Sequence, residues 1–157
     1  YASRLHYISD WGVDNGHRGN IEEVTGRFED AAYEIKTIDF MTANRELYPA
    51  LSDNSVFNKI KEIESGYRSH RFPLIKSKSV SKATKGFLQP GDVIAFACAK
   101  KGLDVSHLGI VIYEDGTAKL LHASSREGRV VIDKLPLIDY VAKNRNITGI
   151  RVFRIKE

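Results

Sequence analysis

The alternation of apolar and polar residues predicts helices in the first half of the chain and strands in the second. The clearest helix spans residues 52–66, where Ser52 or Asp53 can cap the amino end and Gly66 is typical of a helix end. Its apolar positions recur at helical spacing and are Val56, Ile60 and Ile63. A shorter helix is expected within residues 3–14, and it ends before the turn-forming stretch "NGHRGN".

The second half of the chain has the period of strands, apart from one late helix. Residues 91–99 are continuously apolar, which indicates a strand buried on both faces. We expect a loop in the Lys/Ser-rich run 76–86 that precedes it. The remaining predicted elements are an extended segment over "IEEVTGRF", a hairpin at 105–125, a strand at 129–133, a helix at 137–144 and a strand at 147–155. Helices followed by an antiparallel meander predict an α+β fold.

The hairpin carries one histidine on each arm. Asp115-Gly116 between apolar arms predicts a two-residue turn, which pairs Glu114 with Thr117. His107 and His122 then share one face as diagonal neighbours, roughly 7–8 Å apart between backbones. In this register Gly109 leaves space beside the two rings. A three-residue turn without a bulge would instead shift the register by one residue and place the histidines on opposite faces.

Composition indicates one domain and excludes several classes of protein. The 157 residues are 42% hydrophobic, and no apolar run approaches the length of a membrane span. The net charge of +4 comes from scattered Lys and Arg residues without interleaved aromatic residues, so we expect no nucleic-acid partner. The single cysteine, Cys98, rules out an internal disulfide. Because the chain starts at Tyr1 and its one methionine is Met41, we expect that a segment preceded it.

Three ordered stretches, "LQPGDVIAF", "SHLGIVIYEDG" and "LLHASS", resemble the NlpC-type, papain-like cell-wall cysteine peptidases. The block "YASRLHYISDWGVDNGHRG" is similar to a Bacteroidetes-rich branch of N-acetylmuramoyl-L-alanine amidases. This resemblance implies a papain-like fold with N-terminal helices packed on an antiparallel sheet. It also implies that His107 is the catalytic base and that His122 orients it. Muropeptides would be the substrate, with no cofactor and a periplasmic or cell-envelope location.

The nucleophile of the resembled family is a cysteine at the start of a helix, upstream of the "YASRLHY" block. A cysteine nucleophile reacts as the thiolate, and a neighbouring imidazole takes its proton. Cys98 ends a strand, where no helix dipole lowers a thiol pKa, so we interpret it as a small buried hydrophobe. Residues 1–157 are therefore expected to form a single catalytic-domain fragment, and the missing N-terminal segment would complete the site.

The N-terminal block has two interpretations. Arg4, His6, Tyr7 and Asp10 could wall the cleft near the nucleophile, with Arg4 holding a carboxylate or the lactyl carbonyl of a muropeptide. Alternatively, Tyr7 and Trp11 are core residues and Arg4 pairs with an acid. Trp11 itself is expected in the core.

Three polar residues near the strands are interpreted mainly as local structure formers. Ser106 and Asp104 immediately precede His107 and are typical of turns, and Ser106 is also a candidate for substrate contact. Asp92 is expected to cap the turn into its strand.

Two other functional classes remain open. A metal hydrolase could use His6, His107 and His122 with Asp10 or Asp104, although no HExxH or CxxC spacing is present. A non-catalytic cell-wall-binding module is the other alternative, if the complete protein lacks the cysteine.

Overall fold

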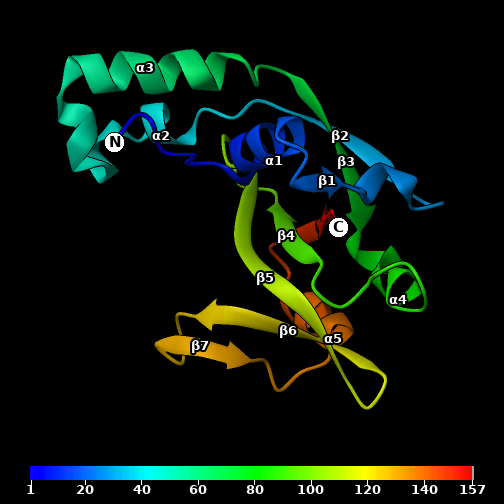
Figure 1. The fold of residues 1–157 in the computed structure, drawn as a ribbon. Coiled ribbons are helices and arrows are strands. Elements are labelled where there is room, and N and C mark those ends of the chain that lie inside the picture. Colours follow the sequence, from blue (N-terminus) through cyan, green and yellow to red (C-terminus); the bar gives the residue numbers. More distant parts are fainter. Residues whose placement is uncertain (157) are drawn as a thin grey trace.

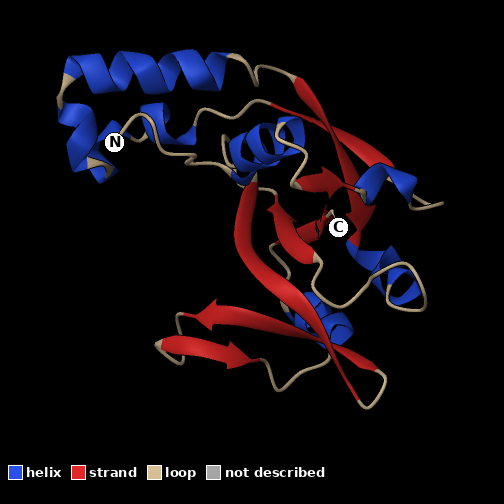
Figure 2. Cartoon of the chain, in the orientation of Figure 1, coloured by secondary structure: helices blue, strands red, loops and turns tan. Residues whose placement is uncertain are grey.

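An antiparallel sheet of eight strands forms the centre of the molecule, and helices pack against it (Figures 1 and 2). These features come from a computed structural model that describes residues 1–156. The strand order is β2-β3-β8-β4-β5-β6-β7, with β1 also pairing with β8. The predicted α+β class with an antiparallel sheet is confirmed.

The elements of the second half follow the predicted order. The strands are β1 (Ile21–Glu23), β2 (Ala32–Lys36), β3 (His70–Lys76), β4 (Val93–Cys98), β5 (Val105–Glu114), β6 (Thr117–Ser124), β7 (Arg129–Ile132) and β8 (Ile147–Ile155). The helices are α1 (Ile8–His17), α2 (Phe40–Ala43), α3 (Asn54–Ser65), α4 (Val80–Ala83) and α5 (Leu137–Lys143), with short 3₁₀ turns at Thr25–Arg27, Arg45–Leu47, Pro49–Ser52 and Ser77–Ser79. Among the described helices, none is long and apolar enough to cross a bilayer.

Helix α3 has the ends expected from its sequence. The Asp53 side chain accepts a hydrogen bond from the backbone N–H of Ser55 at 2.7 Å, and Gly66 follows the last turn. Ile60 is buried on the inner face of this helix.

Helix α1 begins and ends later than predicted, because it continues to His17 inside the stretch "NGHRGN". Strands β2 and β3 were not predicted at all. Residues before Ile8 are not helical, since Tyr7 has extended backbone angles and its side chain is held in the core. Strand β2 lies at the sheet edge with alternating exposure, including exposed Tyr33 and Ile35, so it carries no clear hydrophobic signal. The run 76–86, expected to be a loop, contains a 3₁₀ turn and α4 because Val80 and Ala83 pack into the core.

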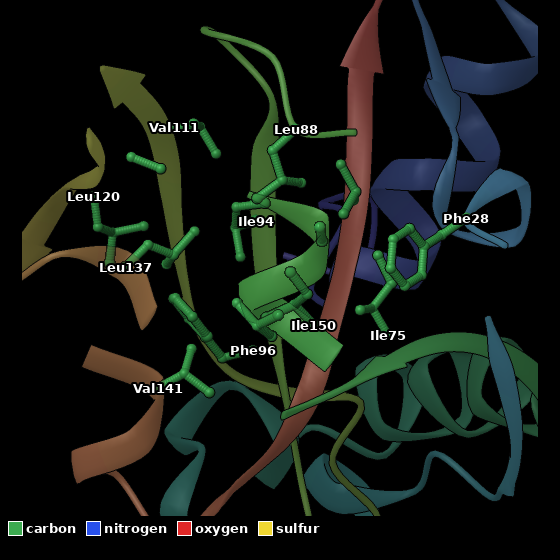
Figure 3. Close-up of a cluster of buried hydrophobic side chains, with 14 of the residues drawn as sticks. Phe28, Ile75, Leu88, Ile94, Phe96, Val111, Leu120, Leu137, Val141 and Ile150 are labelled. Atoms are coloured by element: carbon green, nitrogen blue, oxygen red, sulfur yellow. The ribbon is translucent and has the colours of Figure 1, made fainter. Parts of the chain in front are cut away.

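Strand β4 is central, as its continuous apolar sequence predicted. It pairs with β8 on one side and β5 on the other, and residues 94–98 are buried. On one face of the sheet, Ile94, Phe96 and Ile150 pack with Val111 and Leu120. Figure 3 shows Leu137 and Val141 of α5 in the same cluster, so α5 closes this part of the core.

The hairpin register is confirmed. Asp115 and Gly116 have positive φ angles of 49° and 75°, as a type I′ turn requires, and Glu114 pairs with Thr117. The role expected for Gly109 was wrong. A Cβ atom at Gly109 would lie 2.3 Å from Leu120 Cδ1. The space beside Gly109 is therefore filled by the Leu120 side chain.

Candidate active site

Two imidazole rings meet at the end of the β5–β6 hairpin that lies away from the turn. His107 Nε2 lies 2.8 Å from His122 Nδ1, and the ring planes are nearly perpendicular at 83°. His122 is buried, while His107 is only partly buried. The convergence that the hairpin register predicted is therefore present, and the rings touch through one nitrogen each.

A third polar group, Asp133, lies behind the pair and was not identified from the sequence. Its Oδ2 is 3.3 Å from His122 Nε2, and its Oδ1 accepts the backbone N–H of Leu135 at 2.8 Å. Asp133 follows β7, whose register on β6 pairs Ile132 with Leu121. The loop joining β6 to β7 has no two-residue turn signal, so the sequence did not define this register.

The aspartate sets the direction of the hydrogen bonds along this row. A carboxylate can only accept, so His122 Nε2 carries the proton and donates it to Asp133. His122 Nδ1 is then the acceptor, and His107 Nε2–H donates to it. His107 Nδ1 is left with its lone pair. The Nδ1 atom makes no hydrogen bond to any described residue. Among the described residues every buried side-chain nitrogen and oxygen has a hydrogen-bond partner, so the unbonded Nδ1 atom is exposed to solvent.

The surroundings of His107 favour this neutral form. Burial lowers the pKa of the His107 ring below its ordinary value of 6.5, and the neighbouring His122 lowers it further. Tyr140 of α5 packs edge-on against His122, with ring centroids 5.6 Å apart, and also against Phe96 at 5.2 Å. An unprotonated imidazole with a free Nδ1 can act as a general base at neutral pH.

His107 and Ser106 stand at the boundary of two pockets. The larger, of about 910 Å³, is also lined by His122 and Asp133. The smaller, of about 490 Å³, is walled on one side by His6 and Tyr7. Ser106 is exposed, and its hydroxyl donates to the Phe96 carbonyl at 3.3 Å.

The N-terminal candidates lie in different surroundings. Tyr7 is 5% exposed, and its hydroxyl donates to Glu64 Oε1 at 2.6 Å and accepts the Met41 N–H at 2.9 Å. Burial and the bond to Glu64 raise the pKa of the Tyr7 hydroxyl above its usual range. His6 Nε2 is bonded to the carbonyl oxygen of Tyr1 at 3.0 Å. Tyr7 thus has a structural role, and its contact with substrate stays a prediction.

Arg4 and Asp10 line neither pocket. The exposed Arg4 guanidinium lies 6.0 Å from the centre of the Tyr1 ring. Asp10 is half-buried in α1, and burial raises the pKa of its carboxyl. The structure brings neither side chain to His107, and their roles as substrate contacts stay predictions.

Other polar residues have structural partners. Asp104 is buried and accepts the backbone N–H and the hydroxyl of Ser9, each at 3.0 Å, which ties the start of α1 to the start of β5. Asp92 accepts the Gln89 N–H at 2.8 Å, as expected of a turn cap, and binds Arg154 through both carboxylate oxygens.

Cys98 does not belong to the site. It is 3% exposed at the end of β4, it lines neither pocket, and it makes no hydrogen bond to His107 within the described chain. The interpretation of Cys98 as a buried hydrophobe is confirmed. Trp11 packs edge-on against Phe153 with ring centroids 5.8 Å apart, as expected for a core residue.

The metal alternative lacks a ligand cluster. Over residues 1–156, no three His, Cys, Asp or Glu side chains are grouped so that they could hold a metal ion. His107 Nε2 and His122 Nδ1 face each other at hydrogen-bond distance, which leaves no room for an ion between them.

A family model and a solved structure both relate the chain to N-acetylmuramoyl-L-alanine amidases. The AmiA-like family, described as N-acetylmuramoyl-L-alanine amidase-like, matches residues 1–150. The crystal structure of an N-acetylmuramoyl-L-alanine amidase from Bacteroides uniformis is 35% identical, with a TM-score of 0.91 over 100% of this chain. The chain spans 66% of the length of that protein. No curated protein sequence matches the chain.

Two further structures are similar to the chain. A Bacteroides fragilis protein with a provisional xylanase name is 34% identical, with a TM-score of 0.92, over 98% of this chain and 67% of its own. A Legionella pneumophila protein is 20% identical with a TM-score of 0.70, over 100% of this chain and 64% of its own, and it shares the fold.

Proposed function

The chain belongs to the AmiA-like family of N-acetylmuramoyl-L-alanine amidase-like proteins, and from this premise we propose that the complete protein is a peptidoglycan hydrolase. The bond cleaved is the amide between N-acetylmuramic acid and L-alanine in muropeptides. With such a substrate, we propose a periplasmic or cell-envelope location for the protein. The observation that carries the proposal is the hydrogen-bonded row His107, His122, Asp133, with His107 lining both pockets and its Nδ1 accessible.

The mechanism we propose is that of a papain-like, NlpC-type cysteine hydrolase. The nucleophile is a cysteine outside these 157 residues, because Cys98 is buried, lines neither pocket and makes no hydrogen bond to His107 within the described chain. His107 Nδ1 takes the thiol proton, and the thiolate attacks the lactyl carbonyl carbon. The imidazolium then protonates the alanine nitrogen as the C–N bond breaks. Water hydrolyses the thioester, with His107 as base in this second half-reaction.

His122 and Asp133 act by orientation in this mechanism. Asp133 keeps the proton on His122 Nε2, and His122 in turn keeps the proton of neutral His107 on Nε2. When His107 is protonated during the reaction, the negative charge of Asp133 stabilises the imidazolium through His122. A side chain that accepts a hydrogen bond can partly replace His122.

The proposal is tested on the complete protein with purified muropeptides and mass spectrometry. Release of free stems beginning with L-alanine is the expected result. Cleavage within the stem would identify an endopeptidase, and release of neutral sugars alone would identify a glycosidase and refute the amidase assignment. Inhibition by thiol alkylation but not by EDTA is expected of a cysteine enzyme.

Two variants test the roles of the histidines. His107→Ala removes the general base and acid together, so kcat/KM should fall by about 10²–10⁴-fold or more. His122→Asn should retain measurable turnover, because its amide oxygen can accept the His107 N–H. Circular dichroism controls for folding. If folded His107→Ala stays near wild-type activity, the histidine pair is structural.

A further inference from the structure

The larger pocket is rich in positive charge. Four basic side chains line it: Arg126, Arg129, Lys134 and Lys143. Of these, Arg126 is 3.6 Å from Glu127, the only acidic residue lining the pocket besides Asp133. The other three form no salt bridge with any described residue. Asp133 is already bonded to His122 and to the Leu135 N–H. The pocket therefore keeps uncompensated positive charge.

These three cations come from separate elements, so the fold brings them together. Arg129 begins β7 and pairs with Ser124 of β6, Lys134 follows Asp133, and Lys143 ends α5. Ser124 and Asn144 line the same pocket and add uncharged hydrogen-bonding groups. Arginine and lysine beside such groups form a suitable environment for carboxylates.

The smaller pocket has the opposite character. Its described lining contains no lysine or arginine, and it includes Met41, Tyr48, Leu103 and Leu108. Its one carboxylate, Asp104, is buried and already bonded to Ser9. Since His107 borders both pockets, a substrate whose reacting bond lies at His107 extends into both.

We propose that the larger pocket is a carboxylate-binding subsite that takes the anionic peptide part of the substrate, while the uncharged glycan part enters the smaller pocket. This inference rests on the proposed function for the identity of the ligand. A stem peptide carries free carboxylates, whereas the lactyl carboxyl of the sugar is consumed in the amide. The leaving amine thus departs on the side of the cations, where His107 protonates it.

The test compares two triple variants of the complete protein. Arg129→Gln, Lys134→Gln and Lys143→Gln together remove the pocket cations. Arg68→Gln, Lys59→Gln and Lys61→Gln make the same change of net charge at exposed residues that line neither pocket. Figure 1 shows α3, which carries two of these control positions, at the opposite end of the molecule from β6 and β7.

Each protein is assayed with N-acetylmuramyl-L-alanyl-D-glutamate and with its diamide, which carries no carboxylate. Calorimetry measures binding of the free L-alanyl-D-glutamyl stem independently of turnover. For the pocket triple variant we expect KM and Kd of the anionic ligands to rise roughly 3- to 100-fold. With the diamide, the KM of the pocket triple variant should equal that of the control triple variant. Added salt should reduce the difference between the two variants on the anionic ligands.

The outcomes separate this inference from the proposed function. Equal effects of the two triple variants, or equal effects on the anionic substrate and its diamide, overturn the carboxylate subsite. If the pocket triple variant binds the free stem more weakly than the control triple variant does, but the wild type does not cleave the sugar–peptide amide, the proposed function fails and the subsite stands. If the wild type cleaves the amide and the two triple variants behave alike, the proposed function stands and the subsite fails.

Discussion

Replacing Asp133 with asparagine should reverse the proton positions along the histidine row with almost no change of shape. Asp133 uses both oxygens, Oδ1 for the Leu135 N–H at 2.8 Å and Oδ2 for His122 Nε2 at 3.3 Å. Asparagine has one oxygen. If that oxygen keeps the bond to Leu135, the amide NH₂ faces His122 and donates to it. His122 Nδ1 then carries the proton and donates to His107, whose own proton moves to Nδ1.

The alternative rotamer of the introduced asparagine keeps the competent tautomer but turns NH₂ toward the Leu135 N–H. Two donors then face each other, and leaving a donor unpaired costs about 1–3 kcal/mol. That difference limits the competent population, so kcat/KM should fall roughly 5- to 150-fold. Losing the carboxylate charge, which stabilises the imidazolium, adds to this loss.

Two measurements on the complete protein test this reasoning. Steady-state kinetics with the muropeptide give kcat and KM, and long-range ¹H–¹⁵N NMR of histidine-labelled protein shows which ring nitrogens carry protons. Asp139→Asn is the matched control, since Asp139 is exposed in α5 and lines neither pocket. Near-wild-type activity in folded Asp133→Asn, with His107 Nδ1 still unprotonated, would refute the relay.

Three other predictions concern His107, Cys98 and Tyr7. The His107 pKa is lowered on folding, so its ring should titrate below 6.5 by NMR once accessible thiols are alkylated; its contribution to stability is then complete above that pH and is lost as the pH falls toward the folded pKa. A ring pKa above 6.5 would contradict the lowering. Buried Cys98 should resist alkylation until the protein unfolds, and Cys98→Ala should leave kcat/KM unchanged. Rapid alkylation of Cys98 itself in the folded protein, located by peptide mass spectrometry, would disprove its burial. Tyr7→Phe should lower the free energy of unfolding by about 1–3 kcal/mol in urea titrations, because Glu64 loses a buried donor. Unchanged stability with a raised KM would instead favour a substrate contact.

The side chains that hold the N-terminal segment also shape the wall of the smaller pocket. Ser9 donates through its backbone N–H and hydroxyl to Asp104, and its hydroxyl accepts from Arg151 Nη1 at 2.8 Å. Arg151 is 3% exposed and binds both carboxylate oxygens of Glu23. This network joins α1, β1 and β8 to Asp104, the residue before β5, and so fixes the segment that follows His6 and Tyr7, which line the same pocket as His107.

Local chemistry alone determined the half of the site that lies in the hairpin. Asp115-Gly116 accepts the positive φ angles of a two-residue turn, and strand periodicity then places His107 and His122 on one face. The capped helix α3 and the buried strand β4 were also predictable, because their signals are carried by neighbouring residues.

Only the tertiary structure decided which groups complete the site. Asp133 reaches His122 because β7 pairs with β6 in one register, and the loop between them allows several. Tyr7 lies in the core because Glu64, 57 positions away, accepts a hydrogen bond from its hydroxyl. The lysine and arginine residues that line the larger pocket carry no motif in the sequence, and only the packing of β7, its following loop and α5 places them around one pocket. Periodicity describes interactions between near neighbours, whereas these contacts depend on how complete elements pack, and packing selects partners by shape, burial and charge.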